Sequence, residues 1–175
     1  MMTIFDKMKL YSVTKIFGLV FLALLLSNCY SFTGSSLNPE VKTAHIGVIT
    51  NSAPLRDLTL SNNFTNSLTD RFDQRTNLTI TNESGDISLT GSITKYELSF
   101  ANITAEGTAA QNRLTIAVNI TYENAKDPKK NFQKVFEDFE NFDAQSSLTD
   151  VESTLVPLIT EKLIDRIFNA IITDW

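Results

Sequence analysis

The sequence predicts an α+β fold, a two-layer sandwich in which a mixed, mainly antiparallel sheet of four or five strands carries two helices on one face. Large apolar residues stand at every second position over residues 114–122 without a fault, which is the pattern of a half-buried strand. Large apolar residues recur every four positions over residues 60–72 and again over residues 155–171, which places them along one stripe of a helix. The second face of the sheet should be richer in Thr, Ser and Asn and meet solvent or a partner.

The first 29 residues indicate a lipoprotein leader. Three lysines between residues 7 and 15 precede an apolar run from Ile16 to Leu26. That run is shorter than the about 20 residues that a membrane-spanning helix needs, and it suits the core of a signal peptide. It ends in Leu-Ser-Asn-Cys, which resembles the bacterial lipobox, with Asn28 where Gly or Ala is usual. Cys29 is the only cysteine, and a buried structural thiol would explain neither the leader nor this position. We therefore expect residues 1–28 to be a lipoprotein signal peptide and Cys29 to be acylated with fatty acids such as palmitate.

The remainder of the chain should form one domain. Removal of residues 1–28, which contain three Lys and one Asp, leaves 12 basic and 19 acidic side chains and a net charge of −7, against −5 for the whole chain. This acidic balance argues against a nucleic-acid surface and against electrostatic binding to anionic lipids, so acyl chains must provide the membrane attachment. We expect residues 29–40 to be a lipidated leash and residues 41–175 to be a single α+β domain.

The domain begins with a strand, a helix and a strand. Residues 41–50 predict a short buried strand, which the sequence Asn-Ser-Ala-Pro at residues 51–54 breaks. Asp57 is a candidate N-cap for an amphipathic helix that ends near Arg75, and residues 77–81 predict a second short strand. This order favours a right-handed crossover with the two strands parallel.

The third strand changes the parity of its apolar positions. Ile87, Leu89 and Ile93 occupy odd positions, whereas the next three apolar residues, Tyr96, Leu98 and Phe100, occupy even ones. Because side chains alternate with a period of two, the switch requires a bulge or bend near residues 94–95.

Residues 132–142 are ambiguous. Their apolar residues have helical spacing, but the segment lacks Ala and Leu and is rich in aromatic residues, so we interpret it as a strand with a second parity shift. Its carboxylates are most simply a solvated face that discourages edge-to-edge pairing: Glu137, Asp138, Glu140 and Asp143. Thr149 to Glu152 match a capping box for a long closing helix, which Pro157 would kink if that box is the true start.

The sequence offers no catalytic set. His45 is the only histidine, no second histidine or spare cysteine accompanies it, and neither a Gly-x-Ser-x-Gly elbow nor a phosphate-binding glycine loop occurs. Neighbouring carboxylates such as Glu137 and Asp138 would face opposite ways on a strand. We therefore expect a protein that is not an enzyme and needs no cofactor or metal.

The order of these features resembles a known family. Tyr-Ser-Phe-Thr-Gly follows the cysteine, and the helix NNFTNSLTDRFDQRTNL, the strands ISLTGSITKYEL and RLTIAVNITYEN and the ending IFNAIITDW come in that order. This pattern is similar to the LptE family of lipopolysaccharide-assembly lipoproteins, in its Bacteroidetes form. The resemblance implies a lipoprotein on the periplasmic side of the outer membrane. Such a protein plugs the LptD β-barrel, helps it to fold, and with it moves lipopolysaccharide to the cell surface.

The resemblance also implies contact with lipopolysaccharide through basic residues. Lys126, Lys129 and Lys130 are the only cluster of that kind, in a turn over residues 124–131 that we expect to reach deep into the barrel, although lysines in a turn are usually just solvated. The rival interpretation is a structural or accessory lipoprotein of another envelope complex. A hydrolase that depends on His45 is a distant third.

Overall fold

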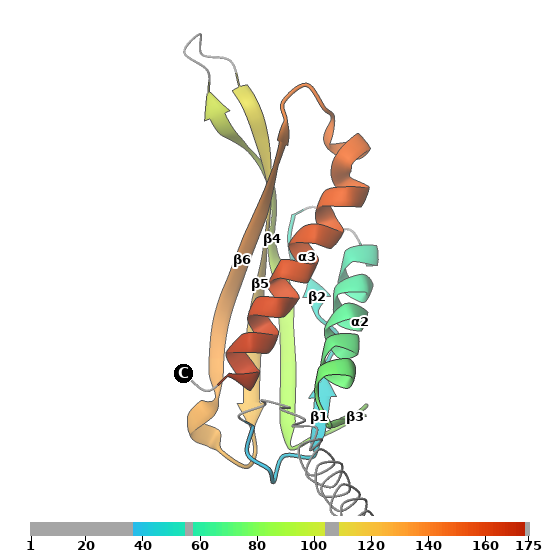
Figure 1. Cartoon of the computed structure of the whole chain (residues 1–175), viewed down its shortest axis with the longest axis vertical. Coiled ribbons are helices and arrows are strands. Elements are labelled where there is room, and N and C mark those ends of the chain that lie inside the picture. The colour runs from blue at the N-terminus through green and yellow to red at the C-terminus, as the bar shows by residue number, and fades with distance from the viewer. Residues whose placement is uncertain (1–36, 55–57, 104–108, 174–175) are drawn as a thin grey trace, which may run out of the picture. The chain divides into compact units, whose positions relative to one another are not determined.

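The computed structural model describes residues 37–54, 58–103 and 109–173, all of which belong to one compact unit of residues 35–175 (Figure 1). The expected signal peptide, Cys29 and the helix cap Asp57 lie outside the described residues. The elements, in chain order, are β1 (Thr43–Ile46), β2 (Thr50–Asn51), α2 (Leu58–Arg75), β3 (Thr79–Thr81), β4 (Ile87–Ile103), β5 (Ala109–Asn124), the 3-10 turn η1 (Pro128–Lys130), β6 (Phe132–Asp143) and α3 (Leu148–Ile172).

The strands form one mixed sheet in the order β3-β1-β4-β5-β6, and the short β2 also pairs with β4. β1 runs parallel to both β3 and β4, as the strand-helix-strand order predicts, whereas β4, β5 and β6 are antiparallel. Helix α3 packs on β5 and β6, and α2 packs on β1, β2 and β3, so both helices lie on the same face (Figure 1). The predicted α+β sandwich is confirmed, with one strand more than five because β2 is separate.

The first predicted strand is divided. After Ile46 the chain leaves the sheet for three residues, and Gly47 donates its N–H to the carbonyl of Leu89 (2.8 Å). Pairing resumes where the sequence suggests a break, because Asn51 pairs with Ile93 of β4. The hydroxyl of Thr65 on α2 accepts the N–H of Ile49 (3.0 Å), which satisfies the backbone where it leaves the sheet.

The bulge in β4 is confirmed where the parity switch predicts it. Ile93 pairs with Val118, and the next pair joins Lys95 to Ala117, so Thr94 has no partner in the register. The extra residue returns Tyr96 to the helix-covered face, where it is buried like Ile93.

β6 is a strand, but its predicted second parity shift is wrong. It pairs with β5 residue for residue from Tyr122–Phe132 to Gln111–Asp143. Its apolar side chains therefore divide between the two faces: the even-numbered aromatic residues pack under α3, whereas Val135 and Phe139 are 55% and 42% exposed on the other side.

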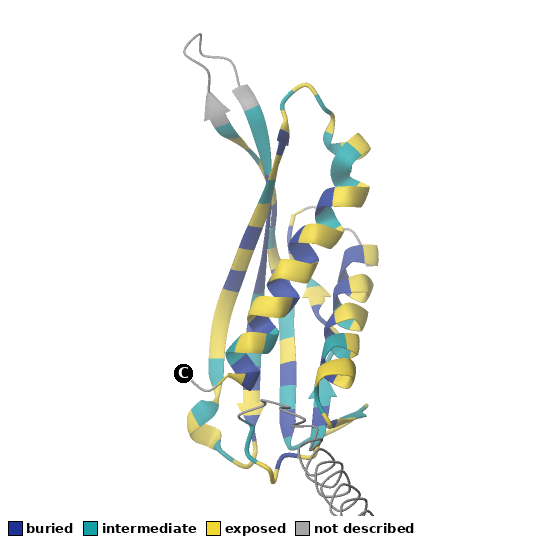
Figure 2. Cartoon of the chain, viewed as in Figure 1, coloured by how far each residue is buried: buried dark blue, intermediate teal, exposed yellow. Residues whose placement is uncertain are grey.

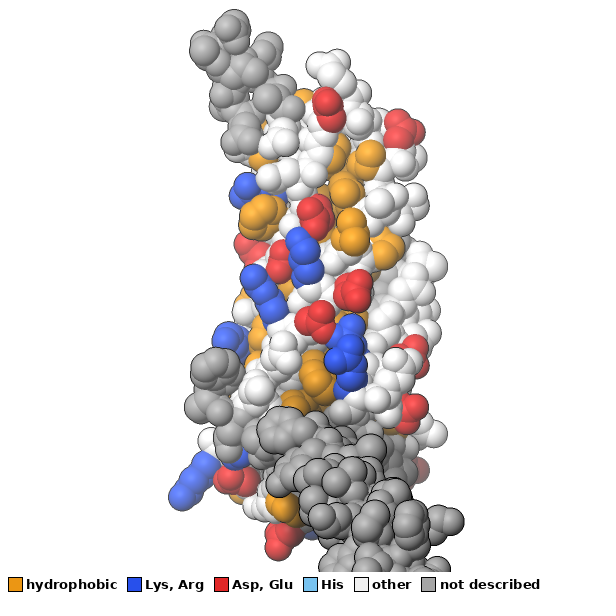
Figure 3. Space-filling model, viewed as in Figure 1, with side chains coloured by type: hydrophobic (Ala, Val, Ile, Leu, Met, Phe, Trp, Pro, Cys, Tyr) orange, Lys and Arg blue, Asp and Glu red, His pale blue; other side chains and the backbone are white. Residues whose placement is uncertain are grey.

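The four carboxylates of β6 divide in the same way, so they do not form one solvated face. Asp138 and Glu140 lie on the helix-covered side and pair with Arg166 (3.3 Å) and Lys162 (2.5 Å) of α3. Glu137 and Asp143 have odd positions in the unbroken register and lie on the opposite side. Figure 3, which views the helix-covered side, shows basic and acidic side chains intermingled.

The closing helix begins two residues earlier than the predicted capping box. Its N-cap is Ser147, whose hydroxyl accepts the N–H of Asp150 (3.3 Å) and donates to the Asp150 carboxylate (2.6 Å). Glu152, predicted to cap the helix, instead accepts a hydrogen bond from the hydroxyl of Tyr96. Pro157 consequently lies inside the helix, beyond its first turn, where it removes one helical N–H.

The core lies between the sheet and the two helices (Figure 2). The predicted core residues are all fully buried: Phe64, Leu68, Phe72, Ile116, Val118, Ile120, Leu163 and Ile167. The Phe72 ring also meets Phe168 of α3 edge-on, with 5.1 Å between ring centroids, and Arg71 forms an ion pair with Asp165, so the two helices contact each other as well as the sheet.

One carboxylate holds the segment through which the chain joins the domain. Asp86, just before β4, accepts the backbone N–H of Lys42 (2.8 Å) and of Thr43 (3.1 Å) and pairs with Lys126 (3.2 Å). The hydrogen bond from Lys42, followed by the one from Lys126, lowers the pKa of Asp86 from 3.8 to about 2. Leu37, within the expected leash, packs against the core just upstream.

We expect Phe64→Ala to lower the free energy of unfolding by roughly 3–5 kcal/mol, because it removes a fully buried ring and leaves a cavity. Asn66→Ala, on the exposed side of the same helix, is the matched control and should change it by no more than about 0.5 kcal/mol. Denaturant unfolding measures both variants. A loss that small at Phe64 would mean that α2 turns another face to the sheet.

We also expect Asp86 to make stability depend on pH in the acid range. Its pKa is lower in the folded protein, so its contribution is complete above about pH 5 and is lost as the pH falls from 3.8 towards about 2. Unfolding curves of the wild type and Asp86→Asn should therefore differ by a constant amount at neutral pH and converge in acid. A difference that stays the same from pH 6 to pH 2 would contradict the assignment.

Candidate functional site

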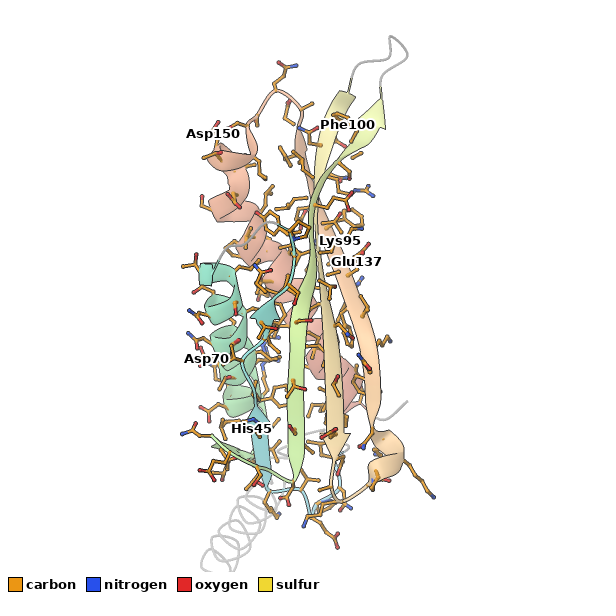
Figure 4. All side chains as sticks on the ribbon, turned by 180° about the vertical axis from the view of Figure 1, so that it is seen from behind. His45, Asp70, Lys95, Phe100, Glu137 and Asp150 are labelled. Atoms are coloured by element: carbon orange, nitrogen blue, oxygen red, sulfur yellow. The ribbon has the colours of Figure 1, made fainter. Side chains whose placement is uncertain are left out.

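One face of the sheet is covered by helices, and within the described part of the chain no element covers the other face. Figure 4 views the molecule from this side, with the helices behind the sheet. Because residues paired across strands share a face, the register identifies the side chains that line it. The main ones are Thr43, His45, Ser88, Thr90, Ser92, Lys95, Glu97, Ser99, Arg113, Thr115, Ala117, Asn119, Thr121, Glu123, Gln133, Val135, Glu137, Phe139 and Asn141. We call this surface the open face, and its richness in Thr, Ser and Asn confirms the prediction from sequence.

Charged residues meet at the middle of the open face. Lys95, Ala117 and Glu137 stand in line on three neighbouring strands, and the ammonium of Lys95 lies 3.4 Å from the carboxylates of Glu137 and Glu97. The side chains of Lys95 and Glu137 lie on either side of Ala117, which is only 2% exposed although no helix covers it. The hydrogen bond to Glu137 raises the pKa of Lys95, so this lysine stays charged at physiological pH.

An arginine and an aromatic ring form the second feature. The guanidinium carbon of Arg113 lies 3.9 Å from the centroid of the Phe139 ring, and its Nε donates to the side-chain oxygen of Asn141 (2.9 Å). Thr115, which pairs with Phe139, is buried beside this cation–π contact. Phe139 and Val135 are therefore the two large apolar side chains within an otherwise polar surface.

His45 is bonded like a strand residue. Its Nδ1 lies 3.1 Å from the backbone carbonyl of Thr81, and its register neighbours are Thr81 and Ser88. Within residues 37–54, 58–103 and 109–173, no group of three or more His, Cys, Asp or Glu side chains could hold a metal ion. No helix among these residues is both long enough and apolar enough to span a membrane.

The lysine cluster predicted from sequence is divided by the fold. Lys126 forms the ion pair with Asp86 that secures the start of β1. Lys129 and Lys130 lie in η1, beside a hollow of about 220 Å³ at the last turn of α3. The turn over residues 124–131 lies at the end of the sheet where the chain joins the domain, opposite the end where β4 finishes and β5 begins (Figure 1).

Sequence reasoning located the open face as a whole but not its two clusters. Lys95 follows the predicted bulge, and Arg113 stands at an odd position just before the alternating run of β5. Their strand positions could therefore have placed them on the open face. The contact of Arg113 with the Phe139 ring could not be predicted in this way, because it depends on the register of β6, for which the sequence suggested a parity shift.

The structure resembles solved structures of other bacterial proteins. Lipoprotein B from Nitrosomonas europaea aligns with a TM-score of 0.52 at 11% identity, covering 73% of this chain and 79% of its own. Protein CT253 from Chlamydia trachomatis gives 0.51 at 6% identity, with 75% and 98% covered, and a minor lipoprotein from Acinetobacter baumannii gives 0.50 at 12%, with 75% and 92% covered. At such low identity these similarities establish the fold alone.

The sequence itself assigns the family. A comparison with curated proteins gives no match. The family model of LptE, described as lipopolysaccharide-assembly, matches residues 41–171, a range that runs from the start of the first strand almost to the end of α3. That match covers well over half of the chain and nearly all of its described fold. The protein is therefore a member of the LptE lipopolysaccharide-assembly family.

Proposed function

We propose that this chain is an outer-membrane lipoprotein, anchored on the periplasmic side through Cys29, that plugs and helps to assemble the LptD β-barrel for export of lipopolysaccharide. Family membership supports the role in lipopolysaccharide assembly, which is not an enzymatic one. The main support for a role as a plug is the open face. The core lies on one side of the sheet, and the other side presents hydroxyls, amides and charges.

A polar face suits a barrel lumen better than it suits lipid. The interior of such barrels is polar, whereas their lipid-facing side is apolar. The hydroxyls and amides of the open face can exchange their water for hydrogen bonds to lumen side chains without leaving buried groups unpaired. Val135 and Phe139 add a small apolar contact, and Arg113 beside Phe139 is of a residue type that often carries much of the binding energy of an interface.

The attachment point supports one orientation of the plug. Cys29 and Leu37, where the described domain begins, are eight residues apart in the sequence and span at most about 29 Å when extended. The end of the sheet that carries the turn over residues 124–131 would therefore stay near the periplasmic leaflet. β4 has 17 residues and spans about 55 Å, so the end of the sheet where β4 finishes and β5 begins would reach deepest into the lumen. Residues 124–131 would then remain at the mouth of the barrel, contrary to the expectation from the sequence that they reach deep into it.

This orientation also changes the candidates for lipopolysaccharide contact. Lys126 already serves the fold through Asp86. Lys129 and Lys130 would lie at the periplasmic mouth of the barrel, where they could meet the phosphates of arriving lipopolysaccharide.

Cys29→Ala should leave residues 1–28 attached or release the chain into the periplasm, because no other cysteine can be acylated. Each buried CH₂ contributes about 0.8 kcal/mol, so two or three chains hold the protein firmly. Membrane fractionation and mass spectrometry of the N-terminal peptide measure this, with Ser31→Ala as the control that should behave like the wild type. Normal processing and membrane binding of Cys29→Ala, in a strain without the barrel, would refute the anchor.

Photo-crosslinking tests the plug. A crosslinker at Ser99, on the open face, or at Phe100, which is 75% exposed near the β4–β5 hairpin, should join the chain to one large outer-membrane barrel. Matched sites at Glu40 and Lys129, which are exposed at the opposite end, should give several-fold lower yields. Depletion should also reduce surface lipopolysaccharide. If depletion leaves lipopolysaccharide export intact and no site crosslinks to a barrel, an accessory lipoprotein of another complex replaces this proposal.

A further inference from the structure

β6 forms a long and unbroken edge of the sheet. It has 12 residues and follows β5 without a bulge, and its other side has no neighbouring strand. The opposite edge, β3, has only three residues. A long regular edge offers unpaired N–H and C=O groups to any other strand, and proteins usually protect such edges.

The middle of this edge is occupied by side chains. In an antiparallel pair, every second residue turns both its N–H and its C=O away from the partner strand. Glu137 and Phe139 belong to such a set. The carbonyl of Glu137 accepts a hydrogen bond from the guanidinium of Arg166 (2.8 Å), and the N–H of Phe139 donates to the Asp138 carboxylate (2.8 Å).

The two side chains that occupy the edge also bind each other. Arg166 of α3 lies 3.3 Å from the carboxylate of Asp138, so one ion pair covers an outward acceptor and an outward donor. Asp138 is nearly buried, whereas the side chain of Arg166 is 59% exposed. The neighbouring pair, Lys162 with Glu140, joins the same helix to the same strand (2.5 Å) through side chains alone.

The edge of β6 beside this ion pair could pair with the same edge of a second copy of the chain. A groove of about 760 Å³ runs between β6 and α3 and is lined by Phe132, Val135, Phe136, Arg166 and Ala170, among others. A two-fold antiparallel pairing centred on Val135 would set Val135 against Val135, Lys134 against Phe136, and Gln133 against Glu137, with no like charges opposed. In that register the N–H of Gln133 in one copy would donate to the carbonyl of Glu137 in the other copy. That carbonyl already accepts a hydrogen bond from Arg166 of its own chain.

We propose that Arg166 and Asp138 guard the edge of β6 and that the strand they exclude is β6 of a second copy of this chain. The guard keeps the protein monomeric even where copies are crowded. It acts twice in the symmetric pair, because each copy presents one blocked Glu137 carbonyl. This inference concerns the edge and is independent of the barrel proposal, which rests on the open face and the family.

Sedimentation of the full-length protein in detergent, over a range of concentrations, tests the guard. Arg166→Ala and Asp138→Ala should dimerise with a dissociation constant at least about tenfold lower than that of the wild type, which corresponds to about 1.4 kcal/mol. Lys162→Ala is the matched control and should remain as monomeric as the wild type. Adding Val135→Pro to Arg166→Ala should abolish the dimer, because proline removes the outward N–H at the centre of the pairing and is tolerated at a sheet edge.

Four results decide the inference. Dimers of Arg166→Ala that disappear with Val135→Pro would support it. It would be overturned if Arg166→Ala stayed monomeric, if Lys162→Ala dimerised equally, or if the dimer survived Val135→Pro. Circular dichroism of each variant shows whether it is folded, and Asp138→Ala provides a second route to the open edge if Arg166→Ala is not.

Discussion

The alternation of side chains along β5 is the constraint on which the rest of the structure depends. β5 pairs with β4 on one side and β6 on the other, so its even positions fix which residues of three strands face the helices. Ile116, Val118 and Ile120 then meet the apolar stripes of α2 and α3 in one core. The side chains at odd positions lie on the open face, where packing within the protein constrains their size and polarity little. A shift of one residue would exchange the two sets, which is why the bulge in β4 is needed.

This division separates stability from recognition. The helix-covered side holds the core, and its surface charges are used in pairs that join α3 to β6 and α2 to α3. Exposed ion pairs contribute little free energy, so their effect is mainly to fix the position of one element against the next. The pair of Arg166 with Asp138 also covers backbone groups of β6. The open face presents hydroxyls and amides, and it also carries the Lys95–Glu137 ion pair and the Arg113–Phe139 contact.

The sequence predicted what depends on local periodicity. The stripe of α2, the alternation of β5 and the bulge near residue 94 all follow from spacing along the chain. β6 was misjudged in detail because its apolar residues lie on both faces, and spacing alone cannot distinguish that arrangement from a shift. The helix cap was misplaced because Ser147–Asp150 and Thr149–Glu152 both match a capping pattern, and only the contact of Tyr96 with Glu152 decides between them. The Asp86–Lys126 and Asp138–Arg166 pairs join distant segments, so they required the assembled fold.

The central claim is that the folded body, through its open face, holds this lipoprotein in a β-barrel partner. The most direct test is to dissolve outer membranes in a strong detergent, isolate the chain by affinity, and identify its partners by mass spectrometry. The detergent removes the bilayer, so only contacts between the proteins themselves can hold a partner. We expect one large β-barrel protein to co-purify in near-equal amount, because polar contacts between folded bodies survive the loss of the lipid. Recovery of the chain alone, or with partners that contain no barrel, would contradict it.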